Sequence, residues 1–109
     1  RHPIATKQFI LDQLARVGED YISELHRAFN DELDRLARER ALDVSIPVSR
    51  RRKFLYHHSS YDTFYGQVKE LMAEGLVEYS GREEPSDDPR YNKWANPPTR
   101  KYVRLARRR

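Results

Sequence analysis

The sequence predicts a small α+β domain in which three helices precede a C-terminal β-hairpin. Apolar residues recur every three or four positions in three separate stretches, which is the period of an amphipathic helix. The last third instead holds two short β-rich runs, 76–79 and 100–105, separated by a polar segment with several prolines. A chain of 109 residues corresponds to a single domain over 1–109 with a modest core.

The first predicted helix spans residues 6–17. Thr6 is the expected N-cap because its hydroxyl can accept a backbone N–H, and Gly18 suits the left-handed position that closes a helix. The apolar stripe consists of Phe9, Ile10, Leu14 and Val17.

The second predicted helix spans residues 21–42, with Asp20 as its N-cap. Its apolar stripe is Ile22, Leu25, Phe29, Leu33 and Leu36. The other faces mix acids and arginines at spacings of three and four, which favours a solvated surface with internal ion pairs over a partner-binding face. The connector 43–58 alternates Val44, Ile46 and Val48 and is a short strand or an extended segment, although Pro47 argues against a central strand.

The third predicted helix spans residues 59–75 and begins at Ser59 or Ser60, with Asp62 completing a capping box. The residues expected to face the core are Tyr61, Phe64, Tyr65, Val68, Leu71 and Met72. The opposite arc collects Ser59, Asp62, Thr63, Gly66 and Ala73. Gly66 costs about 1 kcal/mol relative to alanine in a helix, so something is expected to approach this arc closely. That object is a partner or another helix of the same chain.

The predicted hairpin spans residues 76–106 and is followed by a basic tail, 107–109. We expect one strand at 76–79 and a second at 100–105, joined by a polar loop in which prolines oppose regular structure. Tyr91 and Trp94 within this loop either anchor it against the hairpin or contact a partner.

Positive charge is segregated along the chain, whose net charge is +4. Arg50–Lys53 and the C-terminal arginines form two cationic runs, whereas Glu83, Glu84, Asp87 and Asp88 lie apart from them. Such segregation favours a polyanionic partner, although terminal arginine runs are also common as solubilising segments.

Several classes of protein are not expected. No run reaches the apolar length of a membrane span, and the lack of cysteine fits a reducing compartment, so we expect a soluble intracellular protein of the cytoplasm, nucleoid or nucleus. The sequence contains no phosphate-binding glycine loop and no recognisable catalytic constellation, so we expect no enzyme and no cofactor. His57 and His58 are adjacent and point apart, so no metal site is expected.

The order helix, helix, connector, helix, strand, loop, strand resembles a winged helix-turn-helix domain over residues 6–106. The segment Val68–Val77, VKELMAEGLV, resembles the end of a recognition helix entering the first wing strand in small prokaryotic and archaeal transcription regulators. The chain departs from the compact family pattern in its longer second helix and in the connector that replaces a tight turn.

The resemblance implies sequence-specific binding of double-stranded DNA and transcription regulation, with helix 59–75 in the major groove. It also implies backbone contacts from the basic connector and the wing, and it allows a homodimer. The candidate DNA-contacting residues are Arg50, Arg51, Arg52, Lys53, His58, Ser59, Ser60, Asp62, Thr63, Gly66, Gln67, Lys69, Arg90, Lys93, Arg100 and Lys101.

Two other functions remain open at this point. The long charged second helix and the tyrosines are compatible with a winged-helix module that binds proteins. The first residue is Arg1 and not methionine, which is compatible with a DNA-anchoring module of a larger replication, recombination or RNA-processing protein.

Overall fold

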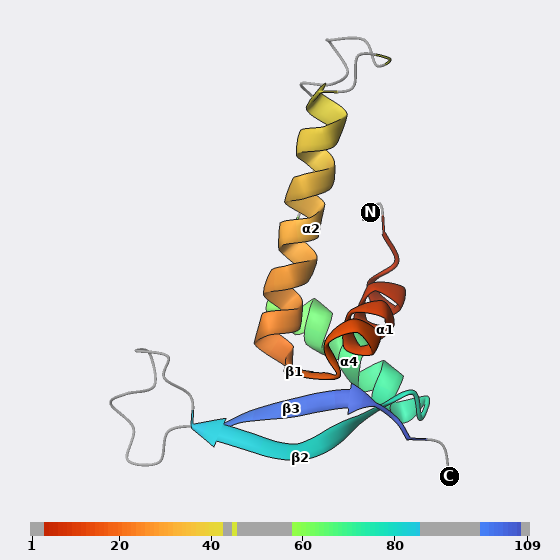
Figure 1. The fold of residues 1–109 in the computed structure, drawn as a ribbon, viewed down its shortest axis with the longest axis vertical. Helices are drawn as coiled ribbons and strands as arrows, with labels where there is room; N and C mark the ends of the chain where they lie inside the picture. The colour runs from red at the N-terminus through yellow and green to blue at the C-terminus, as the bar shows by residue number, and fades with distance from the viewer. Residues whose placement is uncertain (1–3, 43–44, 46–57, 86–98, 108–109) are drawn as a thin grey trace.

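The computed structural model describes residues 4–42, 45, 58–85 and 99–107. Within these residues the protein is α+β, with three helices and a three-stranded antiparallel sheet (Figure 1), which confirms the predicted α+β class and the three helices. The elements are, in order, α1 (Thr6–Val17), β1 (Glu19–Tyr21), α2 (Ile22–Leu42), α4 (Tyr61–Ala73), β2 (Val77–Pro85) and β3 (Thr99–Leu105). None of the described helices is long and apolar enough to cross a membrane.

The sheet has the order β1-β3-β2, so the last strand lies between the other two. Tyr21 of β1 pairs with Tyr102, and Val77 at the start of β2 pairs with Leu105. The sequence did not predict β1, because three residues between two helices are too few to show an alternating pattern. The hairpin lies across the lower end of the helices, and α2 rises away from it as a long column (Figure 1).

One apolar core joins the three described helices to the sheet. Phe29 of α2 lies at its centre, with ring centroids 5.3 Å from Phe9 and 5.7 Å from Phe64. The buried members are Ile10, Leu14, Ile22, Leu25, Phe29, Leu33, Phe64, Val68, Leu71, Val77 and Val103. Burial of this set is what holds α4 against α1 and α2.

The ends of α1 differ from the prediction in two details. The helix has the predicted bounds, but Ala5 is the N-cap and no side chain caps the helix there, so the assignment of Thr6 is wrong. Gly18 does close the helix, with φ of 89° and an N–H that donates to the Leu14 carbonyl oxygen at 2.8 Å. Val17 is exposed, because it lies in the last turn, where the chain leaves the core for β1.

The second helix begins at Ile22, so the predicted start at residue 21 and the Asp20 N-cap are wrong. Asp20 belongs to β1, and its carboxylate accepts the Tyr21 N–H at 2.9 Å. Along the exposed faces, Arg27 pairs with Glu24 and Asp31, and Arg35 pairs with Glu32 and Glu39. These pairs confirm the expected solvated surface with intrahelical pairing.

The first hairpin strand is longer than predicted. It continues through Gly81, where φ is 91°, to Pro85, with an irregular register between Tyr79 and Glu83. The prediction that the strand ends at residue 79 and a loop follows is therefore wrong up to residue 85. Backbone pairing with β3 overrides the weak local preference, and Pro85 is tolerated at the end of an edge strand. The predictions for Val44, Ile46, Pro47, Val48, Tyr91 and Trp94 fall outside the described residues.

Candidate nucleic-acid interface

The third predicted helix, α4, spans Tyr61–Ala73 and is therefore two residues shorter at each end than predicted. Ser60 is its N-cap, and the Ser60 hydroxyl oxygen accepts the Thr63 N–H at 3.2 Å. The same hydroxyl donates to Thr63 Oγ1 at 2.8 Å. The cap is thus Ser60 with Thr63, and the expected capping box of Ser59 with Asp62 is wrong.

One narrow face of α4 is sunk into the core. Phe64, Val68 and Leu71 are fully buried and lie within an arc of about 60° at 100° per residue. Tyr61 and Tyr65 are 44% and 36% exposed, so their predicted place in the core is wrong. They lie on one flank of the buried arc, where their rings stack on each other with centroids 6.0 Å apart.

The opposite face of α4 is left open by the residues that the structure describes, and we call it the open face. Asp62 and Thr63 are exposed, and a Cβ built on Gly66 meets no atom within 4 Å in the described part of the chain. Close packing of another described helix therefore does not account for this glycine. Glycine destabilises a helix relative to alanine, and no described contact requires it at this position. Its presence is compatible with a partner that approaches the helix backbone closely.

Ser59 does not belong to this open face, although it was predicted there. It is 6% exposed, and its backbone N–H donates to Asn30 Oδ1 at 2.9 Å. Its carbonyl oxygen accepts from His26 Nε2 at 2.6 Å and from Asn30 Nδ2 at 3.3 Å. Nothing in the sequence assigns a role to His26. In the sequence, the only indication that His26 and Asn30 act together is their spacing of four residues, which places both on one side of α2 beside the apolar stripe.

His58 faces α2 and not the open face. Its Nε2 atom lies 2.7 Å from Asp34 Oδ1, and both side chains are about half exposed. Together with the contacts of Ser59, this pair ties the segment before α4 to α2. The His58 side chain is therefore directed at α2, away from the face of α4 that carries Asp62 and Thr63.

Two lysines and a tyrosine meet at the corner between α4 and the hairpin, and we call Lys69, Tyr79 and Lys101 the Lys–Tyr–Lys cluster. Lys69 Nζ lies 5.6 Å from the centroid of the Tyr79 ring, and Lys101 Nζ lies 5.7 Å from the same centroid. Lys69 Nζ also donates to Tyr79 Oη at 3.4 Å, which raises the pKa of Lys69. Lys69 Nζ also lies 5.6 Å from the centroid of the Tyr65 ring.

Arg100 lies elsewhere on the hairpin. Its guanidinium is 4.6 Å from the Tyr21 ring and 3.8 Å from Glu84, on the face of the sheet that carries Tyr102. Successive residues of a strand point to opposite faces, so Arg100 and Lys101 do not share a surface. Of these two candidate contacts, only Lys101 lies on the side of the sheet that faces the helices.

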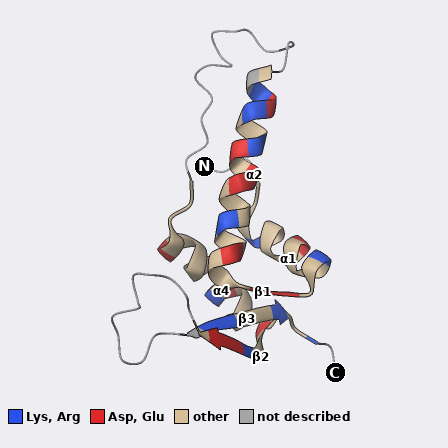
Figure 2. Cartoon of the chain, turned by 60° about the vertical axis from the view of Figure 1, so that its left-hand side comes forward, with Lys and Arg blue, Asp and Glu red and all other residues tan. Residues whose placement is uncertain are grey.

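The other hairpin arginines are paired with carboxylates. Arg82 contacts Glu19 and Glu84, and Arg104 contacts Glu78. Hydrogen bonds from these arginines hold the pKa of each of the three glutamates below its ordinary value. In Figure 2, basic residues colour much of β3 and acidic residues much of β2, and bands of both signs alternate along α2.

Acidic residues near the C-terminal end of α4 also have partners within the protein. Lys7 of α1 lies 2.7 Å from Glu74 and 3.5 Å from Glu70, and Gln67 donates to Glu70 at 3.1 Å. Asp62 therefore dominates the negative charge at the N-terminal half of the open face. The remaining predicted contacts, Arg50, Arg51, Arg52, Lys53, Arg90 and Lys93, lie outside the described residues.

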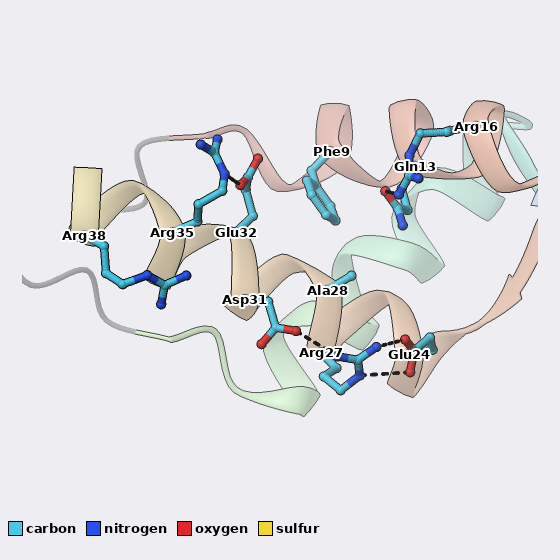
Figure 3. A pocket seen from close by; sticks show the side chains of 10 residues that line it. All are labelled: Phe9, Gln13, Arg16, Glu24, Arg27, Ala28, Asp31, Glu32, Arg35 and Arg38. Atoms are coloured by element: carbon cyan, nitrogen blue, oxygen red, sulfur yellow. Dashed lines mark hydrogen bonds and ion pairs between the residues drawn. The ribbon is translucent and has the colours of Figure 1, made fainter. Parts of the chain in front are cut away.

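A shallow depression of about 570 Å³ lies between α1 and α2 (Figure 3). Its lining carries the ion pairs of Arg27 and Arg35 with their acidic neighbours, so its charges are largely matched within the wall. In the part of the chain that the structure describes, no three histidine or acidic side chains converge as metal ligands would.

No protein family, curated protein or solved structure matches the chain.

Proposed function

We propose that this protein is a winged helix-turn-helix domain that binds double-stranded DNA with sequence preference and acts in transcription regulation. The order α1-β1-α2-α4-β2-β3 and the sheet order β1-β3-β2 are compatible with that layout. In such an arrangement α4 enters the major groove and the β2–β3 hairpin is the wing.

The observation that carries the proposal is the open face of α4. The helix is anchored by one buried face, while on the other Asp62 and Thr63 are exposed and a Cβ at Gly66 would meet no atom of the described residues within 4 Å. Because Gly66 has no side chain, the backbone of α4 can approach a groove closely at that point. The buried face also fixes the orientation of α4, and a fixed orientation is required for specific recognition of bases.

The polar groups on this face match base edges in the major groove. Thr63 Oγ1 accepts from Ser60, so its own proton is available for a base acceptor such as guanine N7 or thymine O4. The Asp62 carboxylate can accept from the amino group of cytosine. The helix N-terminus adds a partial positive charge that favours a nearby phosphate.

Backbone contacts would supply affinity that does not depend on sequence. In the proposal, Arg50–Lys53 of the connector and Lys101 of the hairpin lie along the phosphates. Arg100 has no part in it, because it lies on the other face of the sheet.

A protein-binding module is the second candidate. It is favoured by the exposure of Tyr61 and Tyr65 and by Asp62, since exposed tyrosines are common at protein interfaces and an acid repels phosphate. A duplex titration at two salt concentrations separates the two functions, because phosphate contacts make affinity fall steeply with salt.

Selection from a random duplex library tests the proposal. We expect one enriched motif, lost or altered in Gly66→Glu and Thr63→Ala. Arg51→Ala and Arg52→Ala should weaken binding to every duplex and flatten its salt dependence. A library without enrichment, together with duplex binding that does not respond to salt, would refute the proposed function.

A further inference from the structure

We infer that the Lys–Tyr–Lys cluster is a binding site for one backbone phosphate of duplex DNA, at the corner between α4 and the hairpin. The inference rests on the proposed function and deepens it, because it identifies a single residue set for a single phosphodiester. The sequence does not predict that Lys69 and Lys101 lie close to one tyrosine, because Lys69 belongs to a helix and Lys101 to the last strand.

The backbone explains why the three side chains converge. Tyr79 pairs with Val103, whose side chain is buried beneath the helices, so Tyr79 lies on the helix-facing side of the hairpin. Lys101 is two residues from Val103 and therefore points to the same side. Lys69 reaches this corner from α4, and both ammonium groups come to rest near the Tyr79 ring.

The charge of the cluster is not matched within the described part of the protein. No carboxylate of the described residues lies within ion-pair distance of Lys69 or Lys101, although Glu83 is the cross-strand partner of Lys101. Arg82 and Arg104 on the other face of the same hairpin are each held by a glutamate. Both ammonium groups lie beside one ring and repel each other, and an anion that binds at this corner relieves that repulsion.

The hydrogen-bonding groups fit a phosphodiester. Tyr79 Oη accepts from Lys69, so the phenol proton is available to an outside acceptor. Each ammonium group has three donors, and Lys69 uses one of them on Tyr79. The two non-bridging oxygens of a phosphodiester can therefore accept from both lysines and from the phenol in charge-assisted bonds.

The place of the cluster points to the backbone that flanks the groove. Lys69 follows Gly66 by three residues, a rise of about 4.5 Å along the helix. When the open face of α4 lies in the major groove, one of the two DNA strands that border the groove passes the C-terminal end of α4 beside the hairpin. The cluster is then within reach of that strand and adds no base readout of its own.

The test compares salt dependence among matched lysine variants. Lys69→Met, Lys101→Met and the double variant are titrated against a fluorescent duplex by anisotropy over a series of potassium chloride concentrations. Lys7→Met is the control, since it removes the same charge from a lysine that is already paired with Glu74. Circular dichroism melts of all variants exclude loss of folding as the cause.

We expect each single variant to weaken duplex binding by about tenfold and to lower the slope of log affinity against log salt by up to about 0.9. Because one phosphate is shared, the double variant should lose no more slope than about one phosphate contributes. Tyr79→Phe should weaken binding several-fold without changing the slope, and Lys7→Met should leave both unchanged.

Three results would overturn the inference. Lysine variants that behave like Lys7→Met show that no phosphate lies at the corner. Slope losses of the single variants that add in full in the double variant show two separate phosphates and not one site. If the wild-type protein shows no salt-dependent binding of duplex DNA, the proposed function is refuted, and the inference that rests on it is refuted as well.

Discussion

Replacing Gly66 by alanine tests the open face of α4 through two measurements with opposite expected signs. Gly66 is not among the glycines with positive φ, and an added Cβ meets nothing within 4 Å in the described chain. Alanine therefore gains its full helical advantage over glycine, about 0.8–1.0 kcal/mol, without a compensating clash. For a domain of this size, that gain corresponds to a rise in melting temperature of about 4–8 °C.

The assay is urea unfolding followed by circular dichroism, with the midpoint expected to rise at constant slope. Gly75→Ala is the matched control: it also has open space but a φ of 77°, so alanine there should lose about 1–2 kcal/mol. On the DNA side, the added methyl group should weaken binding to the selected motif although the fold is more stable. A Gly66→Ala protein that is less stable than wild type would refute the reasoning, because it would mean that the face is covered by the chain itself.

Four further predictions follow from the described contacts. Phe29→Ala should lower stability by about 3–5 kcal/mol in urea unfolding, because it empties the centre of the core. Asn30→Ala should cost about 1–3 kcal/mol by leaving the Ser59 N–H without its acceptor, whereas the exposed Asp31→Ala should change stability little. Glu83→Gln should tighten duplex binding and raise its salt slope if the Lys–Tyr–Lys cluster holds a phosphate, and an unchanged affinity would argue against that site. Glu19, Glu78 and Glu84 have pKa values lowered by their arginines from 4.5, so they stabilise the fold above that pH. This contribution should disappear as the pH falls through the lowered values, and Glu78→Gln should flatten the fall seen in pH-dependent urea midpoints.

Periodicity in the sequence was sufficient for the helices and most of the hairpin. The bounds of α1 follow from its apolar stripe and from Gly18, which act within a few residues along the chain. The strand β1 and the extension of β2 to Pro85 escaped prediction, because both depend on pairing with β3 and carry little local signal.

The candidate site divides in the same way. The open face with Asp62, Thr63 and Gly66 was predictable, because helical geometry assigns residues to faces. The burial of Ser59 was not, since it depends on Asn30 and His26 of another helix. The tyrosines of α4 were misplaced because a helical arc shows only which side is apolar, whereas the packed neighbours decide how wide the buried strip is.

The sequence by itself determined which segments are helical, which arc of α4 is apolar and where cationic residues occur along the chain. Only the tertiary structure decided which of those cations are matched by carboxylates and which are left to meet at one corner. Ion pairing is set by distances between side chains of remote segments, and those distances exist only after the chain has folded. Lys69 and Lys101 show the difference, since they come together because Val103 is buried and Tyr79 lies beside it.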